Sequence, residues 1–303
     1  VSNANESWIV DRFRDEWYQH NDSISTDKIL SSDIVWIIAP WNFKKINIPI
    51  IKNKKVICTV HHIDETSFSE KDKKNFMTLD KYIDEYHTIS KISYEQLRKL
   101  TNKRINVIPF WVDNKKWFPI KDKSNLRKKY GLTENEYLIG SFQRDTEGKD
   151  LKSPKLIKGP DIFLDLIKTE FLKRENLKVI LTGKRRNYII NEFNKNSIKY
   201  KYFEMVDTHI LNELYNILNL YIVSSRIEGG PQAILECASA KVPIISTNVG
   251  IAPEILSKKS IIDLKNDFTA KPDIEFQYNN VLKYFIADGM KPFLQMFRGL
   301  HES

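Results

Sequence analysis

The chain has 303 residues, of which 41% are hydrophobic, and its formal net charge at pH 7 is +9. This length and apolar content suffice for two modest domains, and no apolar run approaches the ~20 residues of a membrane-spanning helix. The basic residues are scattered, and no zinc-finger, RNP or KH-type pattern accompanies them, so nucleic acid is not an expected partner.

Two interpretations of the basic surface remain. It is either an ordinary solvated surface or a means of attracting anionic membrane headgroups or an anionic acceptor. The two cysteines, Cys58 and Cys237, each stand in an apolar segment, and the start of the chain shows no signal-peptide pattern. We therefore expect buried thiols in a reducing compartment, which predicts a cytoplasmic protein, either free or at the inner face of the membrane.

Strands and helices are expected to alternate through the first 110 residues. Helical patterns cover residues 8–19, 74–85 and 90–100, and strand patterns cover residues 33–39, 56–60, 86–89 and 105–110. The first strand ends in a turn at Pro40 and Trp41, and the second ends at His61. This alternation indicates parallel sheets, in which ligands bind beyond the carboxyl ends of the strands.

A charged stretch, residues 119–134, is expected to connect two domains. The N-terminal domain is predicted at residues 1–118 and the C-terminal domain at residues 135–278, followed by a helical tail, 279–303, as a candidate to pack back on the first domain. Within the second domain, strands are expected at 137–142, 177–183, 202–205, 220–223 and 242–245, and helices at 160–172, 187–195, 210–218 and from Pro231.

The most informative segment runs from the apolar strand 220–223 through a Gly-Gly turn into an amphipathic helix. Pro231 suits the first position of that helix, because its missing N–H would have no partner there and its φ is preset. The N–H groups of Gln232 and Ala233 are then left without partners at the positive end of the helix dipole. This arrangement predicts a phosphate site.

Two carboxylates flank the predicted phosphate site, Glu228 in the preceding loop and Glu236 one helical turn beyond Gln232. Carboxylates are poor neighbours for a bare phosphate but good ones for a phosphate that carries hydroxyl-rich groups. A nucleotide sugar has this character, since the diphosphate can take the amides while the ribose and sugar hydroxyls take the carboxylates.

The same segment resembles a known family. The string EGGPQAILECASAKVPIIST, which starts at Glu228, is similar to the EGxPxxxLE signature of retaining GT-B glycosyltransferases of family 4, with Lys241 where the family has glycine. The resemblance implies an α/β fold of two Rossmann-like domains with a cleft between them. The N-terminal domain is expected to be reduced, because the family's first strand and Gly-rich loop have no counterpart before Trp8.

The resemblance also implies an activity. It is the transfer of a hexose-type sugar, with retention of configuration, from a UDP- or GDP-linked donor to a carbohydrate or lipid-linked acceptor. No metal and no other cofactor is expected. Arg144 and Lys158 are expected to neutralise the diphosphate, although residues 145–157 lengthen the loop between them and make Lys149 and Lys155 rivals of Lys158.

Further roles follow from the resemblance. Glu228 either contacts the transferred sugar or caps the Gly-Gly turn in solvent, and Glu236 is expected to hold the ribose. His61, in a string similar to the family's TVHD, is expected to face the donor sugar across the cleft. The remaining donor-binding candidates are backbone positions at turns and strand ends: Gly183, Val206, Gly229, Gly230, Gln232 and Ala233.

Three alternatives stay open. The cations Lys184–Arg186 either attract the diphosphate or form an exposed helix start. Phe110 and Trp111 stand where the family string IPNGVD has Asn and Gly, and they either line the cleft or serve packing. The chain as a whole could instead be a nucleotide-sugar epimerase of the same fold, or a non-catalytic binding subunit on an anionic surface.

Overall fold

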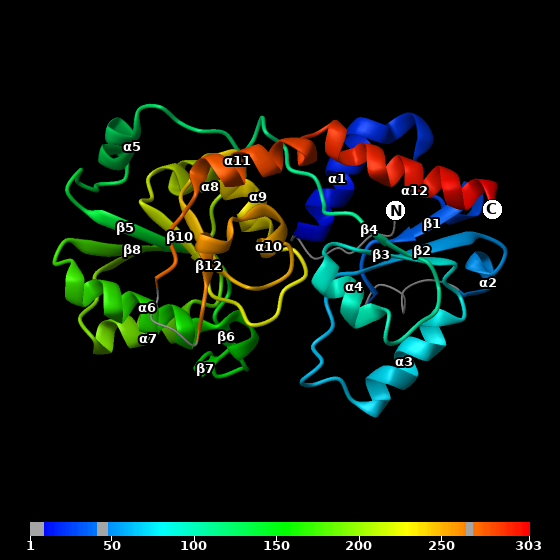
Figure 1. Ribbon diagram of the computed structural model, residues 1–303, viewed down its shortest axis with the longest axis horizontal. Coiled ribbons are helices and arrows are strands. Elements are labelled where there is room, and N and C mark those ends of the chain that lie inside the picture. The colour runs from blue at the N-terminus through cyan, green and yellow to red at the C-terminus, as the bar shows by residue number, and fades with distance from the viewer. Residues whose placement is uncertain (1–8, 41–47, 265–268) are drawn as a thin grey trace. The chain divides into compact units, whose positions relative to one another are not determined.

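The computed structural model describes residues 9–40, 48–264 and 269–303, which form two compact units (Figure 1). The first unit comprises Val1–Phe110 and Ala287–Ser303, and the second comprises Trp111–Ile286. Trp8 and Trp41, at the expected first helix and first turn, lie outside the described residues. The expected connection, residues 119–134, falls inside the second unit, and residues 287–303 belong to the first.

The first unit contains a parallel four-stranded sheet in the order β1-β2-β3-β4. Its strands are β1 (Ile34–Ile37), β2 (Lys55–Val60), β3 (Glu85–Thr88) and β4 (Ile105–Val107). Its helices are α1 (Ile9–Asn21), α2 (Ile48–Ile51), α3 (Glu70–Asp80), α4 (Lys91–Leu97) and α12 (Lys291–Glu302). The alternating strands and helices expected from the sequence are confirmed here.

Helix α3 lies four residues earlier than its apolar pattern predicted. Ser69 and Asp72 form a reciprocal capping box, in which each side chain accepts from the backbone N–H of the other. This cap fixes the helix start at Glu70. The segment that follows Asp80 leaves the helix, so that β3 begins already at Glu85.

Aromatic packing fills the first unit between α1, the sheet and α12. Phe110 stacks on Phe13 with ring centroids 3.9 Å apart, and Trp36 contacts both Trp17 and Phe293 at 5.5 and 5.6 Å. Phe110 is buried. Of the two alternatives for this residue, the structure shows packing, and residues 287–303 supply part of the core of this unit.

A buried polar chain crosses the same core and involves a histidine that the sequence pattern did not single out. The indole N–H of Trp36 donates to Oγ1 of Thr59 (2.8 Å), and that hydroxyl lies 2.9 Å from Nδ1 of His87. Nε2 of His87 lies 2.7 Å from the carbonyl oxygen of Ile108. Because a carbonyl only accepts, Nε2 carries the proton, and Nδ1 accepts from the threonine.

The protein should therefore lose stability on mild acidification. Burial lowers the pKa of His87 to about 3, so this imidazole stays neutral in the folded state while it titrates near 6.5 in the unfolded chain. Between these values the unfolded state binds more protons. Stability is thus fully present above about pH 6.5 and falls below it, by about 2 kcal/mol at pH 5 from this residue.

Chemical denaturation at pH 7.5 and pH 5 tests this expectation. The His87→Gln variant should show a smaller loss between the two pH values than the wild type. His20→Gln, which changes an exposed histidine of the same unit, is the matched control and should keep the full loss. An unchanged pH dependence in His87→Gln would contradict the assignment.

The second unit contains a six-stranded parallel sheet in the order β12-β11-β10-β5-β8-β9. Its strands are β5 (Tyr137–Ser141), β8 (Leu177–Thr182), β9 (Tyr200–Phe203), β10 (Leu220–Val223), β11 (Ile244–Thr247) and β12 (Ile261–Ile262). The chain starts at β5, adds β8 and β9 on one side, and then returns to the other side of β5 with β10. The order of the strands therefore reverses between β5 and β10.

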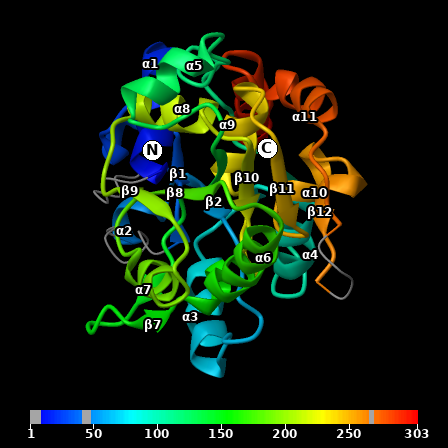
Figure 2. The same ribbon diagram turned by 90° about the vertical axis from the view of Figure 1, so that its left-hand side faces the viewer.

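Helices cover both faces of this sheet (Figures 1 and 2). One face carries α6 (Pro160–Lys173) and α7 (Asn187–Lys195). The other carries α8 (Thr208–Asn216), α9 (Gln232–Ser239) and α11 (Ile274–Val281), and two smaller helices are α5 (Lys123–Lys129) and α10 (Ala252–Ile255). Successive side chains of one strand, such as those of Leu138 and Ile139, pack into the hydrophobic cores on opposite faces of the sheet, as a strand buried on both faces requires.

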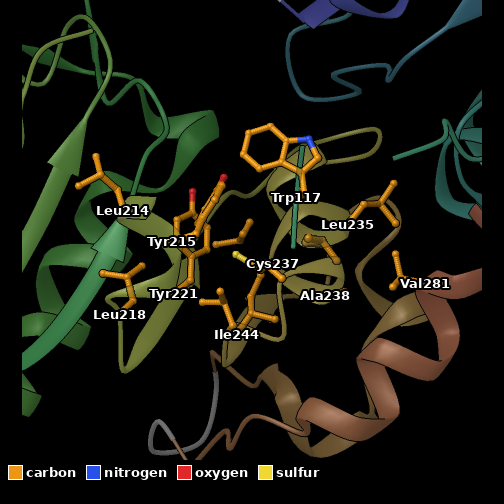
Figure 3. Packing of buried hydrophobic residues seen from close by; sticks show 14 of the residues in the cluster. Trp117, Leu214, Tyr215, Leu218, Tyr221, Leu235, Cys237, Ala238, Ile244 and Val281 are labelled. Carbon is orange, nitrogen blue, oxygen red and sulfur yellow. The ribbon is translucent and has the colours of Figure 1, made fainter. Parts of the chain in front are cut away.

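The core beneath α8 and α9 surrounds a group of aromatic side chains and one thiol (Figure 3). Tyr215 contacts the rings of both Trp117 and Tyr221, at 5.8 and 5.2 Å.

Cys237 and Cys58 are both free and buried, which confirms the expectation of buried thiols. Burial raises the pKa of each thiol.

In the second unit β9, α8 and β11 are each shifted by two residues from their expected ranges, and two further features were not expected. The charged stretch 119–134 contains α5, which Asp122 caps and which Arg127 anchors by donating to the carbonyl oxygens of Glu134, Glu136 and Ile217. The long loop after β5 contains a small hairpin, β6 (Thr146–Glu147) and β7 (Ser153–Pro154). The contact of Arg127 with Ile217 spans 90 positions, which a local sequence pattern does not encode.

Lys241 has φ +52°, a left-handed conformation. The family signature has glycine at this position. In this chain a lysine adopts the left-handed conformation at the turn between α9 and β11. None of the described helices combines the length and the apolarity that crossing a bilayer requires.

Candidate functional site

Two loops of the second unit meet at the point where its strand order reverses. One follows β5 and runs to Lys158, and the other follows β10 and leads into α9. The N–H groups of Arg226 and Ile227 both donate to the carbonyl oxygen of Ile157, at 2.8 and 3.2 Å. Ligands of open α/β sheets bind at such a switch point, beyond the carboxyl ends of the strands.

Two glycines let neighbouring loops touch backbone to backbone: Gly159 joins the loops after β5 and β10, and Gly250, in the loop after β11, joins that loop to the one after β10. Gly159 has φ +58°, and a Cβ there would lie 1.9 Å from the carbonyl oxygen of Ser224. Gly250 has φ +48°, and a Cβ there would lie 2.2 Å from the carbonyl oxygen of Gly229. No side chain fits at either position, so the loops that carry Lys158 and Glu228 are held at a fixed separation.

Lys158 and Glu228 form an ion pair across the two loops through Nζ and Oε1. Lys158 ends a short 3-10 turn, Leu156–Lys158, directly before α6, as the Lys-Gly-Pro string predicted. Both side chains are mostly buried, with 22% and 14% of their surface exposed. Glu228 therefore does not stand alone in solvent, and the structure brings together two predicted site residues that are 70 positions apart.

A network of neutral side chains supports the pair. Nε2 of Gln143 donates to the carbonyl oxygen of Lys158 (2.7 Å) and lies 3.1 Å from Oγ of Ser224. The hydroxyl of Ser225 lies 3.0 Å from Oε1 of Gln143 and 3.0 Å from Oε1 of Glu228. The sequence pattern did not mark Gln143 or Ser225, although Gln143 directly follows one predicted strand and Ser225 stands two residues after another.

Further cations gather near Lys158. Nε of Arg144 donates to the carbonyl oxygen of Thr146 (2.9 Å). Burial lowers the pKa of Lys155, and the positive charges of Arg144 and Lys158 lower it further. Lys155, Arg144 and Lys158 therefore form one basic cluster, whereas the other predicted rival, Lys149, is exposed.

Within the cationic string after β8, Arg186 has a different role from either alternative left open by the sequence. Arg186 is buried and paired with Asp145 (Nε to Oδ2, 2.5 Å), and its Nη1 donates to the carbonyl oxygens of Ser141 and Thr182. It is neither a diphosphate ligand on the surface nor part of an exposed helix start. Lys184, by contrast, is exposed.

Helix α9 begins one residue later than expected, at Gln232, with Pro231 as the residue before it. The φ of Pro231, −57°, still suits the helix entry. Within the described part of the chain, the backbone N–H groups of Gln232 and Ala233 have no acceptor. They remain available to an anion, as predicted, while the side chain of Gln232 donates to the carbonyl oxygen of Trp111 (2.8 Å).

The family profile described as Glycosyl transferases group 1 matches residues 122–289, more than half of the chain. The chain belongs to the glycosyl transferases group 1 family. It is accordingly a glycosyltransferase, and the matched region contains every loop described above. No curated protein matches this sequence.

Solved structures share the fold of this glycosyltransferase. Sucrose-phosphate synthase from Thermosynechococcus elongatus matches with a TM-score of 0.71 and 13% identity over 97% of this chain and 77% of that one. HepE from Anabaena, in complex with UDP and glucose, matches with a TM-score of 0.70 and 15% identity over 90% of this chain and 78% of that one. A glycosyltransferase from Rickettsia africae ESF-5 matches with a TM-score of 0.65 and 17% identity over 99% of this chain and 83% of that one. The fold is GT-B, with two Rossmann-like domains, as the sequence predicted.

Glu236 of the glycosyltransferase is a buried carboxylate, with a relative exposure of 4%. The hydroxyl of Tyr215 donates to its Oε2 (2.8 Å), and Tyr215 is itself buried. A carboxylate so far from water needs partners that donate hydrogen bonds. The residue is thus not an ordinary charged position on a helix surface.

The other predicted residues lie as follows. His61 belongs to the first unit, where its Nε2 donates to the carbonyl oxygen of Ile38 (2.9 Å) and burial lowers its pKa to about 4, so the imidazole is neutral. Gly183, with φ +92°, accepts from the hydroxyl of Tyr202 through its carbonyl oxygen. Val206 packs against the core beneath α8 and α9.

Proposed function

We propose that this glycosyltransferase moves a hexose-type sugar from a UDP- or GDP-linked donor to a carbohydrate or lipid-linked acceptor, with retention of configuration. The observation that carries the proposal is the Lys158–Glu228 pair at the strand switch point, beside the basic cluster. The start of α9, with two N–H groups that lack acceptors, belongs to the loop that carries Glu228. A cation and a carboxylate side by side suit a ligand with a diphosphate next to a hydroxyl-rich group.

The roles divide by chemistry. As the bond to the sugar breaks, negative charge grows on the leaving diphosphate, and Lys158, Arg144 and the first amides of α9 stabilise it without a metal ion. Glu228 accepts hydrogen bonds from the sugar. Glu236 accepts them from the ribose, with Gly183 and Val206 near the nucleotide.

Other parts of the proposal rest on the sequence resemblance. His61, with a neutral imidazole, contacts the donor sugar from the first unit, which binds the acceptor. The GT-B structure of HepE in complex with UDP-glucose supports a nucleotide-sugar donor for this chain as well. We place the protein in the cytoplasm or at the inner face of the membrane, in line with its free, buried thiols.

A donor assay tests the proposal. The protein is incubated with UDP-glucose, UDP-N-acetylglucosamine or GDP-mannose, with and without saccharide and lipid-linked acceptors, and the released nucleotide and the product are measured. Transfer from one of these donors is expected. Release of nucleotide without an acceptor product would favour an epimerase-type reaction, and no release from any donor would indicate a binding subunit.

The ribose contact makes a separate prediction. Glu236→Gln should weaken donor binding about tenfold, because an amide replaces one of two acceptor oxygens of a charged group. Tyr215→Phe is the matched control, since it removes the protein's own donor to Glu236 and leaves the carboxylate. Titration calorimetry with the preferred donor measures both variants. Wild-type affinity in Glu236→Gln would remove Glu236 from the donor site.

A further inference from the structure

The Lys158–Glu228 pair is tied to two neutral side chains, one on each loop. Gln143 binds the backbone carbonyl of Lys158 through Nε2 at 2.7 Å and the hydroxyl of Ser225 through Oε1 at 3.0 Å. The same hydroxyl lies 3.0 Å from Oε1 of Glu228, the atom that Lys158 contacts. One amide and one hydroxyl thus connect both ends of the ion pair.

The orientation of the Gln143 amide follows from its neighbours. Its NH₂ group faces two oxygen atoms, the carbonyl of Lys158 and Oγ of Ser224. A reversed amide would set two carbonyl oxygens against each other, which is unfavourable. Oε1 therefore faces Ser225 and is an acceptor for its hydroxyl proton.

The hydroxyl of Ser225 has one proton and two acceptors at the same distance. It can donate to Gln143 or to Glu228, but not to both at full strength. In the structure the ammonium of Lys158 already donates to Glu228. When a diphosphate attracts that ammonium, Glu228 loses a donor, and rotation about a single bond brings the Ser225 proton to it.

We propose that Ser225 is a positioning residue that replaces Lys158 as the donor to Glu228 when the sugar nucleotide binds. This inference rests on the proposed function, since it takes Lys158 to bind the diphosphate and Glu228 to bind the sugar. In the free enzyme the proton rests on the side of Gln143. In the complex the hydroxyl keeps the Glu228 carboxylate aimed at the sugar hydroxyls. A nucleoside diphosphate without a sugar also draws Lys158 away, but it offers no sugar hydroxyls to the Glu228 carboxylate, so its affinity gains little from this orientation.

Calorimetric titration with two probes tests the inference. UDP-glucose, UDP-N-acetylglucosamine and GDP-mannose are first compared on the wild type, and the tightest of them is then paired with its parent diphosphate, UDP or GDP. Ser225→Ala should weaken the sugar nucleotide about tenfold and change the affinity for the diphosphate less than about twofold. Ser224→Ala is the matched control, because its hydroxyl contacts Gln143 and the Lys158 carbonyl. It should leave the ratio of the two affinities as it is in the wild type.

A second comparison separates positioning from a general structural role. In a Glu228→Ala background, Ser225→Ala should have no further effect on the ratio of the two affinities, since the partner of the hydroxyl is gone. If Ser225→Ala leaves the ratio of the two affinities at its wild-type value, whether or not both probes bind more weakly, this inference is overturned and the proposed function is not. A wild-type protein that binds none of the three sugar nucleotides would overturn the proposed function together with it.

Discussion

Lys158→Ala should slow sugar transfer by about 10²–10³-fold, the loss expected when one preorganised group that stabilises developing charge is removed. The side chain is mostly buried and directed at Glu228, and Arg144 and Lys155 belong to the same basic cluster. The diphosphate would still meet these cations and the amides of α9, so donor binding should weaken less than turnover.

Steady-state kinetics on the preferred donor measures this effect. Lys149→Ala is the matched control, because it removes an exposed lysine from the same loop, and it should transfer at the wild-type rate. Lys155→Ala should fall between the two. Wild-type turnover in Lys158→Ala, or an equal loss in Lys149→Ala, would remove Lys158 from the site.

Arg186→Met should destabilise the second unit by about 3–5 kcal/mol, the usual cost of leaving one partner of a buried ion pair without the other. Asp145 is almost fully buried, and Arg186 also donates to the carbonyl oxygens of Ser141 and Thr182. The pair connects the loop after β5 with the loop after β8. Its loss should therefore also disturb the loop that carries Arg144.

Denaturant unfolding measures the change, with Lys184→Met as the control at an exposed cation of the same string. The control should stay within about 0.5 kcal/mol of the wild type. Adding Asp145→Asn to Arg186→Met should recover part of the loss, because the buried carboxylate becomes neutral. A small effect of Arg186→Met, comparable with that of Lys184→Met, would show that the pair contributes little.

The sequence predicted those parts of the fold that local patterns encode. The apolar run 220–223 and the amphipathic pattern 187–195 coincide with β10 and α7. The GT-B fold and the glycosyltransferase family followed from one string of residues after β10. This string combines a turn, a helix start and two carboxylates within a short span, so its chemistry is visible without the tertiary structure.

What the sequence missed depends on contacts between distant residues. Arg186 belongs to a string of charged residues that suggests an exposed surface. It is nevertheless buried, because the carboxylate of Asp145, 41 positions earlier, neutralises its positive charge. The contact of Lys158 with Glu228 spans 70 positions. His87 belongs to no recognisable motif. Its place in the buried polar chain depends on three neighbouring strands, which align Trp36, Thr59 and the imidazole.

In the proposed mechanism the second unit binds the diphosphate of a sugar donor at the switch between β5 and β10. A crystal structure of the protein with its preferred sugar nucleotide tests this most directly. We expect the diphosphate at the first amides of α9 and within hydrogen-bond distance of Nζ of Lys158, with that ammonium withdrawn from Glu228. A nucleotide bound elsewhere, with Lys158 and Glu228 still paired, would show that this site does not bind the donor.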